Sequence, residues 1–486
     1  MIVQSAANCK NQLVDPPQAH FSFDKSLEKY GKYIYNGEKL STEDAAPPKK
    51  PFGEQTVNNM KQFTIVSDTP DKLLQLLDSL RDKPYYKNAS DRLLLVMSGV
   101  SGADAARGAL ERLSVKAQDV KLAGLTTANP GGTVWTLLLF ERSRVELCHY
   151  DCGAADVGEA AKQLRRTLRY QKHAAGVVLF SSLPGGDTER FLSLLGKNGR
   201  LTAPVFGALA DSEASPSVLG GFGADERGIV ALVLCGAMLQ LHYHYDVGWR
   251  PIGKEFRVSE TDGACLVSQL DGEPAVRVYE KYLGIAADRG FVDNARGFPL
   301  ALERGGRRVL RCPTGFDRSG RLHFNAPLAE GDAVRLCCAS PRRLLEESQL
   351  YADALRAFEP QALLLTVCDS RTRFLGEPPG SDVCGCTVFL PQCARSEVCA
   401  GILLDQHGGG IVNSAVVSLA MREGDAHKAR PVVLPEPRAQ SAFPLDERLA
   451  HYLAQTTVEL DEAKAALASL RGTAGGQADD QKSEVQ

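Results

Sequence analysis

The sequence predicts an α/β protein with mixed sheets in two related halves, followed by a C-terminal helix. Two stretches lead to this prediction. Residues Gly176–Ser212 read as strand, glycine-rich turn, helix and strand, which is the order of a parallel βαβ unit. Residues Leu93–Gly124 follow the same order, and each unit has a glycine late in its closing strand, at Gly124 and Gly207. We interpret the two units as an internal duplication.

The elements around these units follow from the spacing of apolar residues. Leucines on one face predict a helix over Asp71–Leu80, and a second amphipathic helix covers Val157–Tyr170. Gln62–Val66 reads as the strand that opens the folded part. The apolar run Thr133–Phe140 and the alternating run Arg144–Tyr150 predict antiparallel strands of a mixed sheet. Asp187 is expected to cap the helix of the second unit.

The second half is predicted to begin near Gly248–Gly253, after a hairpin that turns at Gly223–Gly228 and a strand at Gln240–Asp246. Short alternating runs then indicate strands, and one longer run indicates a helix. The expected elements are strands Arg307–Arg311, Arg321–Phe324, Ala333–Leu336, Ala362–Val367, Asp382–Phe389 and Ile411–Ala420, with a helix over Pro341–Arg356.

Six segments are predicted along the chain. Residues 1–59 are polar and aperiodic and form a disordered arm, while 60–250 and 251–425 are the two α/β halves. A proline-rich linker covers 426–444, a helix covers 445–472, and 473–486 form a disordered tail. Apolar residues between Leu449 and Leu470 repeat at spacings of four and three, which predicts a coiled coil that joins a homodimer.

Composition narrows the functional class. Hydrophobic content of 44 % and charged content of 24 % over 486 residues are typical of globular proteins. A net charge of −3 gives no general attraction to nucleic acid or to a membrane surface. The N-terminus has no secretory pattern, and no apolar run reaches the roughly 20 residues that span a bilayer. We expect a cytoplasmic protein whose thirteen cysteines are free thiols.

A small-molecule site is expected at the turns that follow the parallel strands, because ligands bind beyond the carboxyl ends of such strands. The alternative is that the turn residues only cap helices and shape turns. Cys368 ends a further strand and begins a third turn of this kind, with Arg371 as a donor for an anionic group. The candidate ligand-binding residues are Ser98, Ser101, Asp104, Ser181, Ser182, Asp187, Asp211, Cys368 and Arg371.

Several stretches, in this order along the chain, also occur together in one known family. They are Ala203–Ser212 (APVFGALADS), Gly228–Gly236, Gly248–Gly253 (GWRPIG), Leu270–Gly284, Phe298–Leu300, Gly331–Asp332, Val334–Leu336 and Leu363–Arg371 (LLLTVCDSR). Over roughly Met60 to Arg422 the sequence resembles the FIST sensory domain, first its N-terminal part (FIST N) and then its C-terminal part (FIST C).

The resemblance implies an intracellular signal-input protein without catalytic activity. Family members occur beside histidine kinases and diguanylate cyclases in bacteria and in eukaryotic F-box proteins. The resemblance thus implies a small-molecule ligand and a partner histidine kinase or diguanylate cyclase. No output domain follows the helix, so we expect signalling in trans or through dimerisation. The alternatives are a protein-binding adaptor and a hydrolase with Cys368 as nucleophile.

Some bacterial family members bind haem and report nitric oxide, which makes haem a second hypothesis for the ligand. A haem ligand must point an imidazole or a thiolate into an apolar pocket. The candidates are His149, His242, His244 and Cys312, of which His242 and His244 share one face of a strand. The alternative is that each histidine is a partly exposed strand residue.

Four cysteines cluster late in the second half. Thiols at such density suit zinc or an iron–sulfur cluster, but their spacing matches no standard site. We expect buried thiols, with redox sensing and metal binding as alternatives. The four are Cys384, Cys386, Cys393 and Cys399.

Overall fold

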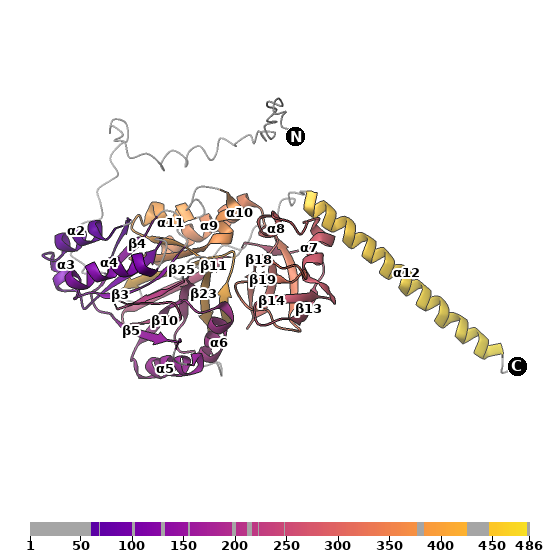
Figure 1. Ribbon diagram of the computed structural model, residues 1–486, viewed down its shortest axis with the longest axis horizontal. Coiled ribbons are helices and arrows are strands. Elements are labelled where there is room, and N and C mark those ends of the chain that lie inside the picture. The colour runs from indigo at the N-terminus through magenta and orange to yellow at the C-terminus, as the bar shows by residue number, and fades with distance from the viewer. Residues whose placement is uncertain are drawn as a thin grey trace, which may run out of the picture. The chain divides into compact units, whose positions relative to one another are not determined.

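The computed structural model describes residues 60–483, except 68, 100–102, 128–131, 154–155, 197–200, 211–215, 222, 247, 377–382 and 425–446. The predicted N-terminal arm, linker and end of the tail therefore lie outside the described residues. Where it is described, the chain forms three small mixed sheets, one larger antiparallel sheet and the helices that cover them (Figure 1). No described helix combines the length and the apolar character needed to cross a membrane.

The first two sheets are built from two repeats of one pattern. In repeat 1, β2 and β3 are parallel and joined by α4, and the strands lie in the order β1-β4-β2-β3. In repeat 2, β6 and β7 are parallel and joined by α6, in the order β5-β10-β6-β7. Repeat 1 consists of β1 (Lys61–Val66), α2 (Asp71–Leu80), α3 (Pro84–Lys87), β2 (Asp91–Ser98), α4 (Ala103–Lys116), β3 (Lys121–Thr126) and β4 (Val134–Phe140). Repeat 2 consists of β5 (Arg144–Asp151), α5 (Val157–Tyr170), β6 (Ala174–Ser181), α6 (Gly185–Gly196), β7 (Val205–Leu209), β8 (Val218–Gly220), β9 (Gly223–Asp225) and β10 (Gly228–Cys235).

The predicted duplication is confirmed by the register of the two parallel pairs. Gly124 pairs with Val96, and Gly207 pairs with Leu179. A Cβ atom would lie 1.9 Å from the Val96 carbonyl oxygen at Gly124 and 1.8 Å from the Leu179 carbonyl oxygen at Gly207. Both glycines are therefore required by the same close approach of neighbouring strands.

A third repeat, which the sequence did not predict, completes the pattern. Its sheet has the order β11-β25-β21-β22, and β21 and β22 are parallel, like the corresponding strands of repeats 1 and 2. Repeat 3 consists of β11 (Leu239–Asp246), α9 (Pro341–Leu355), a 3-10 turn (Arg356–Phe358), β21 (Ala362–Cys368), α10 (Asp369–Leu375), α11 (Cys384–Phe389), β22 (Ala394–Val398), β23 (Ala400–Asp405), β24 (Gly408–Val412) and β25 (Val416–Glu423).

A nine-stranded antiparallel sheet is inserted between β11 and α9 of repeat 3. We call it the inserted domain. It consists of β12 (Arg250–Pro251), β13 (Phe256–Thr261), β14 (Leu266–Leu270), β15 (Glu273–Pro274), α7 (Ala275–Leu283), α8 (Phe291–Ala295), β16 (Leu300–Arg304), β17 (Arg307–Arg311), β18 (Pro313–Phe316), β19 (Leu322–Phe324) and β20 (Ala333–Cys338).

The three repeats share one apolar core and are linked by exchanged hairpins. The inner faces of all three sheets contribute to one large buried cluster, whereas each outer face packs on its own helices. The β8–β9 hairpin of repeat 2 extends the sheet of repeat 1 through β3, and the β23–β24 hairpin of repeat 3 extends the sheet of repeat 2 through β7. In Figure 1 the helices of the repeats lie in separate groups: α2–α4 at the left, α5 and α6 at the bottom, and α9–α11 at the top.

Four local predictions were wrong. The strand expected over Ile411–Ala420 is two strands, β24 and β25, separated by residues 413–415. The described part of the strand expected over Asp382–Phe389 contains the helix α11 instead, which lies in the crossover from β21 to its parallel neighbour β22. Asp187 does not cap α6, which begins two residues earlier at Gly185. The turn expected at Gly223–Gly228 contains the short strand β9, and the chain reverses on both sides of it.

The C-terminal helix is confirmed as α12 (Glu447–Ser483), although it continues through most of the segment predicted as a disordered tail, and its first turns dock on the inserted domain. Tyr452 is 3 % exposed, and its hydroxyl accepts a hydrogen bond of 3.0 Å from the Lys254 amide. Glu459 accepts a hydrogen bond from the Tyr282 hydroxyl, and its carboxylate lies 3.1 Å from Lys281 Nζ and 3.7 Å from Lys254 Nζ. We call these five residues the α12 clamp.

Acidification is expected to open the α12 clamp. Burial opposes the charge on Glu459, but hydrogen bonds from Tyr282 and Lys281 and the charge of Lys254 outweigh it, so the pKa of Glu459 is lowered from 4.5. A carboxyl group with a lowered pKa stabilises the docked state above its ordinary pKa, and this stabilisation is lost as the pH falls through the lowered value. Amide exchange in the segment 449–459, corrected for the intrinsic effect of pH, should therefore rise below about pH 4.5.

The matched variants for this experiment are Glu459→Gln and Glu462→Gln. Glu459→Gln should weaken protection of 449–459 at neutral pH and remove most of the acid dependence. Glu462 is exposed on the same helix, so Glu462→Gln should behave like the wild type. Equal protection of this segment at pH 3.5 and pH 7 in the wild type would show that Glu459 does not hold α12.

Candidate functional site: the end of β21

The carboxyl ends of β6 and β21 are arranged alike but bonded differently. The Ser182 amide donates to the Gly228 carbonyl at 3.1 Å, and the Cys368 amide donates to the Ala415 carbonyl at 3.0 Å. In repeat 2 the Ser182 hydroxyl also bonds the β9–β10 turn, donating to the Asp225 carbonyl and accepting from the Gly228 amide, both at 2.9 Å. The thiol of Cys368 instead donates to the carbonyl of Cys399 at 3.1 Å. The Cys368 sulfur is also hydrogen-bonded by the Ser414 backbone, so the turn between β24 and β25 is bonded by a thiol where its counterpart is bonded by a hydroxyl.

Asn413 and Ser414 form this turn and are fully buried, each 0 % exposed. Neither the nitrogen nor the oxygen of the Asn413 amide has a hydrogen-bond partner among the described residues. Ser414 has a φ of 52°, in the left-handed region that residues other than glycine seldom adopt. A buried polar group without a partner typically costs about 1–3 kcal/mol, so such groups in one strained turn indicate a place for a ligand.

Two thiols contact the turn, and a third, that of Cys399, belongs to the residue whose carbonyl bonds Cys368. Cys368 is 0 % exposed, and the Cys312 thiol faces the hydroxyls of Ser370 and Ser414. Burial raises the pKa of Cys368 well above its ordinary value and that of Cys312 to about 11, so both are neutral thiols. We call Cys312, Cys368, Cys399, Asn413 and Ser414 the strand-end cluster.

The strand-end cluster is closest to solvent at Cys399. This residue is partly exposed, and so is Asn325, whose amide nitrogen lies 3.3 Å from the Cys399 sulfur. On another side of the cluster, Asp369 accepts from the Ser370 amide at 2.6 Å, and burial raises the pKa of this carboxyl group. The cluster is therefore buried and polar, with partly exposed residues at one end.

Sequence models of two protein domains match the chain. The FIST N domain matches residues 92–273, and the FIST C domain matches residues 275–384. The chain belongs to the FIST domain family. FIST domains are in general sensory signal-transduction domains that bind small ligands, and they are in general non-catalytic. A search of curated proteins finds none that matches this FIST chain.

The FIST N and FIST C matches meet inside the inserted domain. FIST N covers the parallel pairs of repeats 1 and 2, and FIST C covers α7 through β21 and part of α11. Cys312 and Cys368 therefore lie in the FIST C match, whereas Cys399, Asn413 and Ser414 lie beyond its last residue. The strand-end cluster thus joins FIST C to the hairpin that returns to repeat 2.

The candidate residues of the FIST N half are largely engaged in local structure. Ser98 is 2 % exposed and Ser181 is 0 % exposed. The Ser181 hydroxyl lies 2.8 Å from that of Thr188 and accepts from the Leu183 amide. Asp187 pairs with Arg227 at 3.4 Å. Ser101, Asp211 and the side chain of Asp104 lie outside the described residues.

Arg371 is engaged by other groups of the protein and is not directed at a place for an anionic ligand. Its side chain is 0 % exposed, and it donates to the Ser348 hydroxyl at 3.0 Å. Its guanidinium also lies 5.9 Å from the centre of the Trp249 ring. These contacts attach α10 to α9 and to the start of the inserted domain, so Arg371 is a structural cation in this fold.

The predicted haem candidates do not surround a space of haem size. His242 and His244 share one strand face as predicted, and both rings stack on Tyr351 of α9. Burial lowers the pKa of His242. The cavity beside His244 has a volume of about 10 Å³, enough for one water molecule. His149 lies at the other side of the fold, with Nε2 2.5 Å from an Asp225 oxygen. These residues do not fit a haem group.

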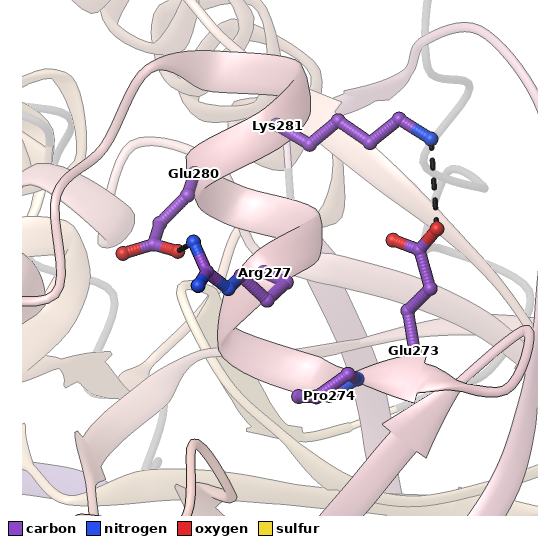
Figure 2. A pocket seen from close by; sticks show the side chains of 5 residues that line it. All are labelled: Glu273, Pro274, Arg277, Glu280 and Lys281. Carbon is purple, nitrogen blue, oxygen red and sulfur yellow. Dashed lines mark hydrogen bonds and ion pairs between the residues drawn. The ribbon is translucent and has the colours of Figure 1, made fainter.

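A surface hollow of about 450 Å³ lies beside α7, but its charges are paired with each other. Figure 2 shows Arg277 directed at Glu280 and Lys281 directed at Glu273, at 2.9 and 3.6 Å. Lys281 also belongs to the α12 clamp. The hollow therefore presents no excess charge to a ligand, and we favour the strand-end cluster as the site.

The predicted cysteine cluster is divided by the fold. Cys386 and Cys393 are buried against α9 on the outer face of the repeat 3 sheet, as expected of core thiols. Cys399 instead belongs to the strand-end cluster, and the side chain of Cys384 is not described. Each cysteine whose side chain is described is a free thiol. No group of three or more ligating side chains in the described part of the chain is arranged for a metal ion.

Proposed function

We propose that this FIST protein binds a small polar ligand at the strand-end cluster and passes the binding event to a partner signalling enzyme, a histidine kinase or a diguanylate cyclase, in trans. One observation carries the proposal. The complete Asn413 amide is buried without a partner among the described residues, in the strained turn beside Cys368.

The chemistry of the cluster favours a ligand that both donates and accepts hydrogen bonds. Asn413 offers two N–H donors and a carbonyl acceptor, and Ser414 adds a hydroxyl. The nearby thiols are neutral because of their raised pKa values. A carboxamide or a protonated carboxylic acid matches this arrangement, since each presents a donor and an acceptor side by side. The proposed ligand is thus a small molecule with such a group.

A continuous set of packed side chains leads from the cluster to α12. Cys312 lies near Tyr279 of α7, whose hydroxyl bonds the Phe298 carbonyl at 3.0 Å. One turn later on the same helix, Tyr282 donates to Glu459 of the α12 clamp. Because the turn is buried, ligand binding would favour a more open arrangement of these elements, and a shift of α7 would act on the clamp.

Binding is favoured over hydrolysis by the state of the thiol. A cysteine nucleophile acts as a thiolate and needs a lowered pKa. Burial raises the pKa of Cys368 well above its ordinary value, and the thiol donates its hydrogen to a backbone carbonyl. The hydrogen bond from the Cys368 thiol to the Cys399 carbonyl can instead stabilise the closed arrangement of the cluster before a ligand binds.

Native mass spectrometry of the full chain tests the proposal. Wild-type protein purified without added ligand is expected to carry a non-covalent small molecule that is released on denaturation. In Asn413→Leu, which keeps the branched shape of the side chain but removes the amide, the fraction of protein that carries the small molecule should fall at least tenfold. Gln406→Leu removes an exposed amide from the β23–β24 turn and should keep it.

Circular dichroism verifies that each variant is folded, and Ser414→Ala provides a milder change at the same turn. Partial loss is expected for Ser414→Ala because the Asn413 amide remains. If folded wild-type protein has only the mass of the chain itself, the proposal is contradicted. It is also contradicted if Asn413→Leu carries the small molecule to the same extent as the wild type.

A further inference from the structure

Helix α12 carries an apolar stripe that nothing in the described chain covers. Leu453, Leu460 and Leu467 are 53, 54 and 51 % exposed and are separated by seven residues each. Thr456 and Ala463 lie between them at the spacing of three and four that continues one helix face. The stripe lies on the side of the helix that carries Leu449 and Tyr452, which are buried on the inserted domain, and its leucines are exposed from Leu453 onward.

The stripe is too regular and too long for an unpaired surface helix. The helix spans 37 residues, yet among its described side chains the contacts with the inserted domain reach no further than Glu459. From Leu460 to Leu467 every residue is exposed. Helices in water gain most of their stability from packing of an apolar face, so this segment needs a second surface.

We propose that α12 pairs with α12 of a second copy of this chain in a parallel two-stranded coiled coil whose seam begins at Leu453. With Leu453, Leu460 and Leu467 at the a positions, Thr456 and Ala463 are the d positions. Glu459 is then a g position and Lys464 an e position. In a parallel pair a g residue faces the e residue five positions later in the other helix, which brings Glu459 next to Lys464 of the second copy.

The charge pattern selects both the partner and the direction. A second copy supplies the matching cation without any further assumption, because the same helix carries both charges. In an antiparallel pair, g positions face g positions, and the contact between Glu459 and Lys464 is not made. Lys464 is 3.4 Å from Asp461 within its own helix, an exposed pair that is readily exchanged.

The carboxylate of Glu459 connects the proposed coiled coil to the inserted domain. Glu459 is held by Lys281, Tyr282 and Lys254 in the clamp and is also the residue that pairs across the seam. The clamp therefore fixes where the seam begins in each copy. The inference goes beyond the proposed ligand binding and does not depend on it, since it rests on α12 and its clamp alone.

Molar mass of the full chain in solution tests the pairing. Wild-type protein at about 50 μM is expected at twice the chain mass of 52.4 kDa by light scattering during gel filtration. The triple variant Leu453→Gln, Leu460→Gln, Leu467→Gln should be monomeric. The matched control Val458→Gln, Ala465→Gln removes apolar side chains from the other face, including the 52 % exposed Val458, and should remain dimeric. A monomeric wild type or a dimeric triple variant overturns the proposal.

Cross-linking tests the direction. In a parallel pair, Leu467→Cys places two thiols across the seam, and mild oxidation should give a disulfide-linked dimer in high yield. Ala465→Cys, on the outer face, measures the background from this residue and from the native thiols. Because an antiparallel pair separates the two copies of residue 467, a yield for Leu467→Cys no higher than for Ala465→Cys overturns the parallel arrangement. Native mass spectrometry reports ligand and assembly separately, so failure of one proposal is distinguishable from failure of the other.

Discussion

Replacing Arg311 with methionine is expected to lower the free energy of unfolding by about 3–5 kcal/mol, measured by urea unfolding. Arg311 lies on β17 of the inserted domain and is 0 % exposed. Its guanidinium donates to the carbonyls of Ile411 at 2.9 Å, Leu310 at 3.0 Å and Pro327 at 3.0 Å. Glu189 of α6 lies 3.9 Å from it. Methionine fills similar volume but leaves these acceptors without their donor.

The expected loss reflects a buried cation that joins three parts of the fold. Burial lowers the pKa of Arg311 to about 10, which still leaves it charged at neutral pH. Its partners belong to repeat 2, to the inserted domain and to the hairpin of repeat 3, so one side chain holds all three together. Because the site is buried, water does not replace the lost donor, and those acceptors stay without a hydrogen bond.

Arg308→Met is the matched control for this measurement. Arg308 lies on the same strand, with a side chain 44 % exposed and 3.7 Å from Glu303. The change should alter stability by no more than about 0.5 kcal/mol. Arg311→Lys, which keeps the charge but not the forked donors, should fall between wild type and Arg311→Met. Equal urea midpoints for Arg311→Met and Arg308→Met would contradict the role given to Arg311.

Gly207→Ala is expected to destabilise the chain by at least about 3 kcal/mol, the upper end of what overpacking usually costs. The new Cβ would lie 1.8 Å from the carbonyl oxygen of Leu179 and 2.7 Å from its carbonyl carbon. These atoms are backbone of the neighbouring parallel strand, so no side-chain rotation can relieve the clash. The strands β6 and β7 would have to separate, which would cost hydrogen bonds in the middle of the sheet.

The same substitution in repeat 1 tests the internal repetition. Gly124→Ala should have a similar effect, because its Cβ would lie 1.9 Å from the Val96 carbonyl oxygen. Gly223→Ala is the control, since the nearest atom to its Cβ is 3.7 Å away. Gly124→Ala and Gly207→Ala should give similar yields of soluble protein and similar melting temperatures, both well below those of Gly223→Ala. A large difference between the first two would argue against equivalent positions.

Repeats 1 and 2 were predictable because each is continuous in the sequence. Apolar strand, glycine turn, helix and strand follow one another within about 35 residues, and local spacing is sufficient to recognise them. Repeat 3 is interrupted, since β11 ends at Asp246 and β21 begins at Ala362. Its crossover helix α11 has the sequence CGCTVF, whose β-branched and aromatic residues favour a strand. Its helical conformation follows from its place in the crossover between the parallel strands β21 and β22, which the local sequence does not reveal.

The candidate site was predictable in part. Cys368 could be recognised because it ends an apolar run and precedes Asp369, as a residue at a strand-to-helix turn does. Asn413 and Ser414 were expected inside one strand over Ile411–Ala420, so neither the turn nor its burial was predicted there. Their burial comes in part from Cys312, which is far from them in the sequence. Arg371 looked available for a ligand because sequence spacing does not reveal its contact with Ser348.

A crystal structure of the full chain, purified without added ligand, tests the central claim most directly. The account predicts electron density for a non-protein group with polar atoms about 3 Å from both Asn413 Nδ2 and Asn413 Oδ1. Density that shows the Asn413 amide bonded only to neighbouring protein groups or to water molecules would contradict it, and the end of β21 would then be a structural joint.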